Sequence, residues 1–300
     1  MAVRSIINIT DDQSSDNHKQ ILQASTTMTL KTTIICSAAD QASMNIMENL
    51  IALHDWERAG DVYEADRFRI VEVEKLHIFC DHIDSELKRR GLPTDMIIFA
   101  SKHKSDNNKR LFSAHFTGNV GDAEFGGNPH ELAPAAPQAL KSFLHSLRNL
   151  AEGTDYEVSM ESTHHGPTAL SVPSIYIEVG STEAEWVDKD AGRIVASAIL
   201  EFSDSNFPVA VGFGGGHYAP RQTKLILETD ITFGHNFPKY QLDNLDYESI
   251  RDALVKSSAD FVYFDRKSMN AAQRNHIRAN VEELGYEVLR ESEIMKRFGR

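Results

Sequence analysis

The histidines of this chain are the residues whose types and spacing could do chemistry. The sequence of 300 residues holds 13 histidines, several of them beside glycine or proline. His164 and His165 stand before a Gly-Pro pair in "STHHGPT", and His217 follows three glycines in "GFGGGHYAP". Histidine binds metals and exchanges protons near neutral pH. These segments are therefore the first candidates for a reaction centre.

Neighbouring side chains point to opposite sides of an extended chain, so His164 and His165 are not expected to bind one metal together. One interpretation is a metal ligand beside a catalytic group. The other is that one ring packs against Pro167 while its neighbour is solvated. The Gly166-Pro167 pair favours a defined turn directly after them.

Three consecutive glycines, Gly214 to Gly216, need a physical reason because glycine loses the most backbone entropy on folding. They either form a tight turn that projects His217 or make room for a ligand against the backbone. The Gly-Lys-Ser/Thr of a phosphate-binding P-loop does not follow them. Pro220 argues against the glycine-rich turn of a dinucleotide-binding helix at this point.

Glu178 ends the largely apolar segment "SIYIEVG". Alternation places Ile175, Ile177 and Val179 on one face and Tyr176 with Glu178 on the other. A carboxylate in such surroundings needs a cation, a metal or a hydrogen-bond donor. A buried salt bridge and a metal site both remain open.

Several histidines and a carboxylate without a thiolate cluster suit a catalytic zinc site, which uses about three protein ligands and leaves one position for water. Such water becomes a nucleophile near neutral pH. The two cysteines, Cys36 and Cys80, are far apart in the sequence. Neither HExxH nor Gly-x-Ser-x-Gly is present, which excludes two common hydrolase motifs. The residues indicate hydrolysis by metal-activated water and do not reveal the substrate.

A basic segment, "ASKHKSDNNKR", surrounds His103 with lysines and an arginine. It is either an anion-binding loop or a solvated charged loop. The net charge of −13 argues against general affinity for nucleic acid. Residues 266–300 nevertheless carry eight basic against five acidic residues, so a local basic patch is possible.

Strand and helix patterns alternate along the chain and must position these groups. We expect strands at 29–38, 67–74, 95–101, 111–116, 156–162, 174–180, 208–214, 260–265 and 286–291. We expect helices at 40–53, with Asp40 as N-cap, and at 81–91, 133–151, 182–202, 247–258 and 270–285. Alternation predicts an α/β fold with a largely parallel or mixed sheet flanked by helices. Because ligands of such sheets bind at the carboxyl ends of strands, the histidine segments could converge there.

Composition indicates a globular protein, with 41% hydrophobic and 25% charged residues. Residues 1–28 are polar and predict a flexible N-terminal extension, and residues 29–300 predict a single α/β catalytic domain. No apolar run approaches the roughly 20 residues of a membrane span, and no signal-peptide core is present. We therefore expect a cytoplasmic protein without a disulfide.

Several motifs taken together resemble the archaeal and plant type of D-aminoacyl-tRNA deacylase. They are "SKHKS", "FGGNPHELAPAAP", "STHHGPT", "EVGSTEAEW", "GGGHYAPR" and "FGHNFPKY", in the order of that family and within roughly residues 29–290. The resemblance implies hydrolysis of the ester between a D-amino acid and the terminal ribose of tRNA, which recycles mischarged tRNA. It also implies zinc dependence and an α/β fold similar to peptidyl-tRNA hydrolase and nucleoside phosphorylases.

The resemblance implies roles for individual residues. The predicted metal ligands are His164, Glu178 and His217. Groups expected to act on the water or the leaving ribose oxygen are His115, His165, Tyr218 and His235. Contacts to the tRNA acceptor end are expected from Lys102, His103, Lys104, Arg110 and Arg221. We expect weak, salt-sensitive binding to tRNA, and neither DNA nor a membrane as a partner, with a monomer as the plausible state.

Two other interpretations stay open. The chain could be a nucleoside phosphorylase-like or a metal-free peptidyl-tRNA hydrolase-like enzyme, for which phosphate dependence or resistance to chelators would be typical. It could instead be a non-catalytic metal- or nucleotide-binding protein whose histidines are structural. A metal that cannot be removed without unfolding would favour that second interpretation.

Overall fold

The computed structural model describes residues 30–106 and 108–300. Residues Lys31–Arg300 form one compact unit. The predicted extension, residues 1–28, lies outside the described residues. Among the described residues, no helix combines the length and the apolar character that a bilayer span requires.

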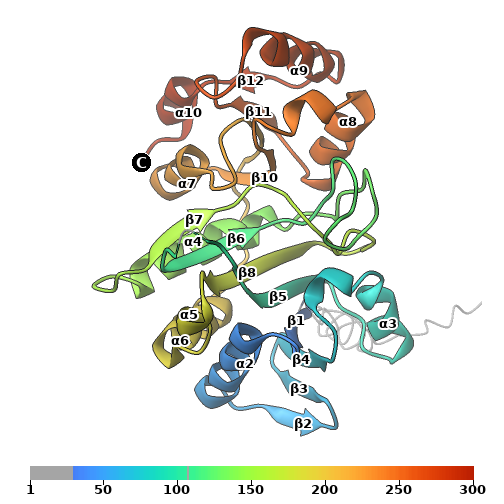
Figure 1. Cartoon of the computed structure of the whole chain (residues 1–300), viewed down its shortest axis with the longest axis vertical. Coiled ribbons are helices and arrows are strands. Elements are labelled where there is room, and N and C mark those ends of the chain that lie inside the picture. The colour runs from blue at the N-terminus through green and yellow to red at the C-terminus, as the bar shows by residue number, and fades with distance from the viewer. Residues whose placement is uncertain (1–29, 107) are drawn as a thin grey trace, which may run out of the picture. The chain divides into compact units, whose positions relative to one another are not determined.

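The larger of two sheets has eight strands in the order β2-β3-β4-β1-β5-β8-β6-β7 (Figure 1). The strands are β1 (Thr32–Ser37), β2 (Glu57–Ala59), β3 (Val62–Ala65), β4 (Phe68–Val73), β5 (Met96–Lys102), β6 (Leu111–His115), β7 (Glu157–Met160) and β8 (Ser174–Gly180). Strands β4, β1, β5 and β8 are parallel, as are β6 and β7. The β2-β3-β4 pairs and the β6-β8 pair are antiparallel. The predicted α/β class with a mixed sheet is confirmed.

The two faces of this sheet are covered differently. Helices α2 (Gln41–Leu53), α4 (Pro137–Leu150) and α6 (Lys189–Leu200) pack on one face. Helix α3 (Ile83–Arg89) and the short 3-10 helix η1 (His77–Phe79) lie against the other, where Ile35 and Phe99 are buried. Because the central strands are buried on both faces, they read as continuous apolar runs in the sequence.

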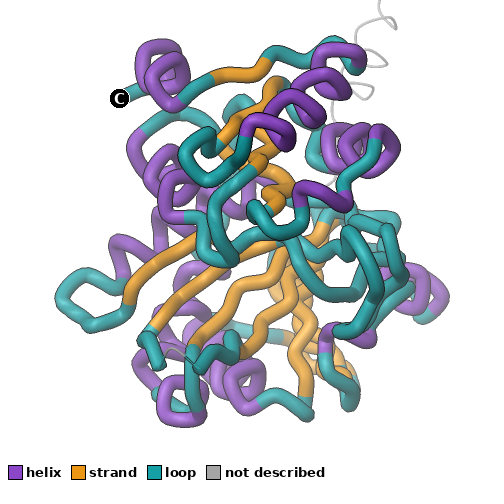
Figure 2. Tube along the Cα trace, turned by 45° about the horizontal axis from the view of Figure 1, so that its top comes forward, coloured by secondary structure: helices purple, strands orange, loops and turns teal. Residues whose placement is uncertain are grey.

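A second, smaller sheet has the order β10-β9-β11-β12, with all of its pairs parallel. Its strands are β9 (Val209–Phe213), β10 (Thr232–Phe237), β11 (Phe261–Phe264) and β12 (Val288–Leu289). Around it lie α7 (Pro220–Glu228), α8 (Tyr247–Lys256), α9 (Ala271–Glu283), α10 (Glu291–Phe298) and the 3-10 helix η2 (Leu242–Asn244). The sequence predicted one sheet, whereas Figure 2 shows two groups of strands in the same unit.

Local signals explain where several helices begin and end. Asp40 caps α2 as predicted, because its side chain accepts a hydrogen bond from the backbone N–H of Ser43 at 3.1 Å. The single helix expected at 182–202 is wrong. The structure has α5 (Glu183–Trp186) and then α6, because the Asp188 side chain caps a new helix by accepting from the N–H groups of Asp190 and Ala191.

Register and direction of the strands decide which side chains share a face. Because β6 is antiparallel to β8, His115 pairs with Tyr176 and Ser113 pairs with Glu178. His103 continues β5 beyond its last residue, since its N–H donates to the carbonyl of Val179 at 2.9 Å. The face that carries Phe99 therefore also carries His103, His115 and Glu178.

Lys141 on α4 links that helix to α7 and the start of β10. Its side chain is buried, and Nζ donates to the carbonyl oxygens of Ile226, Thr229 and Ile231 at 2.7, 2.6 and 2.8 Å. A buried carbonyl that loses its donor destabilises the folded state.

We expect Lys141→Met to lower the free energy of unfolding by about 3 kcal/mol, because three carbonyls lose a charged donor at once. Urea denaturation followed by circular dichroism measures this change. Lys224→Met on α7 is the matched control, since the Lys224 side chain is 53% exposed and joined only to carboxylates at 3.8 Å. Equal effects of the two substitutions would contradict this account of Lys141.

Candidate metal and catalytic site

A cavity of about 540 Å³ opens on the face of the larger sheet that carries Phe99, and its polar lining contains most of the predicted site residues. Five histidines line it, together with Glu178 and two lysines: His77, His103, His164, His165, His217, Lys102 and Lys104. Apolar and aromatic side chains complete the wall. The cavity therefore combines titratable groups with an apolar lining, as ligand pockets of enzymes do.

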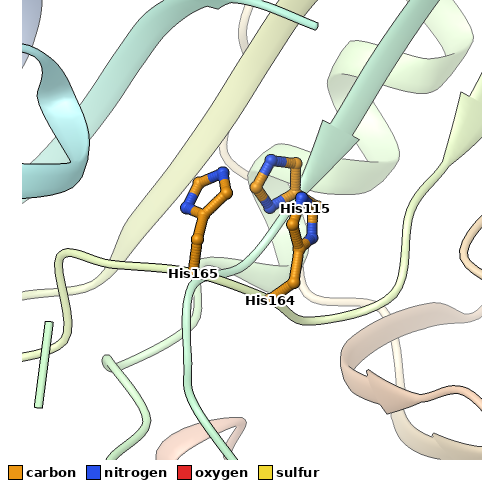
Figure 3. Close-up of side chains that lie close together, drawn as sticks. All are labelled: His115, His164 and His165. Carbon is orange, nitrogen blue, oxygen red and sulfur yellow. The ribbon is translucent and has the colours of Figure 1, made fainter. Parts of the chain in front are cut away.

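Three histidines meet at the base of this site: His115, His164 and His165 (Figure 3). Each Nδ1 lies within hydrogen-bond distance of a backbone carbonyl, of Phe116 at 3.2 Å, of Ser162 at 2.8 Å and of Gly166 at 2.7 Å. A carbonyl only accepts hydrogen bonds, so each Nδ1 carries a proton, and Nε2 is the ring atom that is left for a metal. This is the arrangement that orients metal-binding histidines.

The expectation that His164 and His165 point apart is wrong because the chain is not extended here. His165 has a φ of 43°, in the left-handed region. The two rings consequently lie 4.4 Å apart between centroids. The Nε2 atom of His115, which completes the group, is buried and has no hydrogen-bond partner.

A second group consists of His103, Glu161 and His217. Glu161 is fully buried at the end of β7, with Oε1 3.0 Å from His103 Nδ1 and Oε2 2.8 Å from His217 Nε2. Although these contacts are short, neither carboxylate oxygen has a partner in hydrogen-bond geometry. A buried carboxylate without such partners is strongly unfavourable unless a cation compensates it.

Glu178 lies between the two groups. Its Oε2 is 3.5 Å from His103 Nδ1 and 3.6 Å from His115 Nε2. Glu178 lines the cavity, whereas Glu161 is buried behind it. The two carboxylates thus have different access to anything that enters the cavity.

The surroundings set the charge of these groups. Burial lowers the pKa of His165 to about 4, and repulsion from His115 acts in the same direction. Burial alone would raise the pKa of Glu178, but the imidazoles of His103 and His115 hold it at about 2. A neutral histidine and an ionised carboxylate are the forms that bind a metal.

The residues present fit a divalent metal such as zinc. In each group the nitrogen and oxygen ligand atoms lie within 4.8 Å of one another. Imidazole and carboxylate ligands without thiolates are common at catalytic zinc sites. The unpartnered lone pairs of Glu161 and His115 are the observation on which this fit rests, because a bound cation would satisfy them.

The three glycines before His217 form a tight turn. Gly214 and Gly215 have φ of 104° and 89°, and the N–H of Gly215 donates to Ser268 Oγ at 2.6 Å. The carbonyl of His217 accepts from the N–H of Ser162 at 2.8 Å, which fixes the turn beside the end of β7. The turn therefore carries His217 to Glu161, and the alternative of space for a ligand is not needed to explain Gly214.

The remaining residues predicted to act in catalysis lie at the margin of the site or outside it. Tyr218 is joined to it through its hydroxyl, 2.9 Å from His103 Nε2, and it also lines a separate recess. His235 is fully buried and belongs to neither of these two groups, with its ring nitrogens 3.0 Å from Thr163 Oγ1 and 3.0 Å from the carbonyl of Ala133. The predicted roles of both stay predictions.

The residues predicted to contact tRNA are dispersed. Lys102, His103 and Lys104 line the cavity, and His103 is only 5% exposed because it also belongs to the buried cluster. Arg110 is paired with Asp155 and Asp188, whose carboxylates lie 3.1 and 2.9 Å away. Arg221 is paired with Asp265 at 2.9 Å and lines another recess. The structure brings Lys102, His103 and Lys104 of this group to the cavity lining, but neither Arg110 nor Arg221.

Glu161 is the candidate site residue that was not identified from the sequence. It follows β7 directly and stands three positions before His164, in "ESTHHG". A glutamate at the carboxyl end of a strand that leads into a histidine pair is the signal that could have identified it.

Comparison with known proteins gives a consistent result. A family model described as D-aminoacyl-tRNA deacylase matches residues 90–289. A D-aminoacyl-tRNA deacylase of Methanosarcina acetivorans is 52% identical over 283 residues, covering 90% of this chain and 95% of the relative. One of Archaeoglobus fulgidus is 41% identical over 273 residues, covering 88% and 98%. A crystal structure of a conserved protein of unknown function has a TM-score of 0.85 and 40% identity, covering 90% of this chain and 99% of that one.

We expect Gly214→Ala to lower the free energy of unfolding by about 1–3 kcal/mol, because of its positive φ and because a Cβ would lie 2.9 Å from the carbonyl oxygen of Asp265. Gly216→Ala is the control, since its Cβ would meet only the carbonyl oxygen of Tyr218 at 3.6 Å. Thermal unfolding of both variants measures the difference. A Gly214→Ala protein as stable as Gly216→Ala would show that the turn is not constrained in this way.

Proposed function

The chain belongs to the D-aminoacyl-tRNA deacylase family, and we propose that it hydrolyses the ester of D-aminoacyl-tRNA with zinc held by its buried histidines and carboxylates. It is accordingly a hydrolase of the aminoacyl-tRNA ester bond, with tRNA as its substrate. The products would be a free D-amino acid and a tRNA available for recharging. Removal of D-amino acids from tRNA in this way would be a chiral proofreading reaction. The observation that carries the metal proposal is the set of unpartnered lone pairs on Glu161 and His115.

The proposed ligands follow from the hydrogen bonds of the rings. His115, His164 and His165 would hold one ion through their Nε2 atoms, since each Nδ1 is bonded to a carbonyl. His103, Glu161 and His217 offer a second set. Zinc, when bound, supplies a nucleophile from water near neutral pH.

Glu178 is proposed to orient the attacking water. It was predicted as a ligand, but three histidines already form the usual number of protein ligands for a catalytic zinc. Glu178 is the carboxylate that lines the cavity, 3.6 Å from His115 Nε2. An ionised carboxylate there accepts a hydrogen bond from water. Lys104, exposed at the same cavity, suits contact with a phosphate of the acceptor end.

The direct test is release of amino acid from D-tyrosyl-tRNA and L-tyrosyl-tRNA, each before and after chelation and again after addition of zinc. We expect fast release from the D-substrate alone, lost on chelation and restored by zinc. D-selective release that survives chelation would retain the reaction and reject the metal. Release that requires phosphate would favour a phosphorylase-like enzyme. The absence of release with zinc present would contradict the proposal.

Two substitutions separate a ligand from a group that orients water. His164→Gln should lower both zinc content and kcat/KM, the latter by at least about 100-fold, because a ligand is lost. Glu178→Gln should lower kcat roughly 100-fold while zinc content stays at the wild-type level. Zinc is measured by atomic absorption after gel filtration. His54→Gln, at the surface beside Asp66, is the control and should leave both quantities unchanged.

If Glu178→Gln also removes the zinc, Glu178 is a ligand, as the sequence analysis predicted. If His164→Gln keeps its zinc and its activity, the three-histidine set is wrong. Circular dichroism of each variant shows whether the fold is retained.

A further inference from the structure

Two exposed aromatic side chains border the cavity. Phe125 is 65% exposed and Tyr240 is 59% exposed, and both line the cavity that contains His164, His165 and His217. Most other aromatic side chains of the described chain are buried or partly buried. Exposed aromatic rings beside a reaction centre are more often binding surfaces than packing residues.

Both rings are attached to the segments that carry the histidines. The carbonyl of Phe125 accepts from the N–H of Gly166, next to His165, at 3.0 Å. The N–H of Lys239, next to Tyr240, donates to the carbonyl of Gly215 at 3.0 Å. The rings come from two loops that are far apart in the sequence. In each loop a backbone hydrogen bond to a histidine segment is made by the aromatic residue itself or by the residue next to it.

The loop that carries Phe125 is held closely as well. A Cβ on Gly126 would lie 1.9 Å from the carbonyl oxygen of Ile78, so the backbone there touches the 3-10 helix η1. Gly126 and Gly127 have φ of 76° and 75°. Phe125 therefore lies in a tight turn whose backbone packs against η1, and its position is constrained by that contact.

A cation accompanies the two rings. Lys104 is exposed, lines the same cavity and makes no ion pair with a described residue. Aromatic faces next to an unpaired cation suit single-stranded nucleic acid, because a base stacks on a ring while a phosphate meets the positive charge. A duplex offers no free base face, so the match is to an unpaired end.

We propose that Phe125 and Tyr240 form the stacking site for the unpaired terminal base of the tRNA acceptor end. This inference rests on the proposed function and specifies how its substrate is held. The ester joins the amino acid to the ribose of that same nucleotide, so a base bound at the cavity mouth would place the ester between the rings and the histidines. The phosphate on the 5′ side would then face Lys104.

The competing occupant of the rings is the amino-acid side chain of the substrate. The two can be distinguished because the terminal base is the same in every tRNA, whereas the side chain differs. We therefore compare D-tyrosyl-tRNA with D-alanyl-tRNA for the wild type, Phe125→Ala and Tyr240→Ala. Single-turnover measurements over a range of enzyme concentrations give the half-saturation concentration and the maximal rate separately.

We expect each substitution to raise the half-saturation concentration about tenfold, the effect of losing one stacked base, with a maximal rate within about twofold of the wild type. The factor should be equal for both substrates. Phe79→Ala is the matched control, since Phe79 is 54% exposed and does not line the cavity. Zinc content, measured in parallel, shows that the metal site is intact. An increase confined to the tyrosyl substrate, or no increase in either variant, would overturn the proposal.

A second measurement does not need catalysis. Fluorescence polarisation follows binding of a 5′-labelled CCA trinucleotide and of the same trinucleotide with an abasic 3′ end. We expect the wild type to prefer the intact trinucleotide about tenfold, and Phe125→Ala to lose that preference. If the preference is present but no D-aminoacyl-tRNA is hydrolysed, the proposed function fails and the stacking site stands. If hydrolysis occurs and the abasic trinucleotide binds equally well, the stacking site fails and the function stands.

Discussion

The burial of an ionised carboxylate, whose oxygens have no partner in hydrogen-bond geometry, is the constraint on which the site depends. Glu161 is fully buried, and the neighbouring imidazoles of His103 and His217 hold its pKa well below the usual range even though burial alone would raise it. A buried charge is tolerated only with compensating charge. The two imidazoles next to Glu161 come from the end of β5 and from the turn after β9. A cation among them would satisfy these groups together.

The backbone of both sheets brings these site residues together. The antiparallel β6-β8 pair sets His115 beside Tyr176, and the rings lie 5.0 Å apart. The turn after β9, which belongs to the smaller sheet, brings His217 to β7 of the larger one. A single parallel sheet would place all its carboxyl ends along one edge, whereas here the site receives candidate ligands from two sheets. The exposed rings of Phe125 and Tyr240 are hydrogen-bonded to the same segments, so the candidate metal ligands and the proposed base site are held by the same part of the backbone.

Much of the fold could be predicted from the sequence, because the buried strands are continuous apolar runs and Asp40 is a strong helix cap. The prediction failed in segments where one residue is compatible with two different structures. Pro220 reads as an interruption, but it occupies the first turn of α7, where proline is favoured. For the site, the sequence indicated which histidines could take part but not how their side chains are arranged in space. The positive φ of His165 and the burial of Glu161 depend on tertiary contacts that no local pattern contains.

Anomalous diffraction from crystals grown with zinc, recorded on both sides of the zinc absorption edge, tests the central claim most directly. The account predicts an anomalous peak within bonding distance, about 2.0–2.1 Å, of the Nε2 atoms of His115, His164 and His165. A second peak beside Glu161 and His217 would be consistent with the second ligand set. A map without a peak among these side chains, or with zinc bound only at surface histidines such as His54, would contradict it.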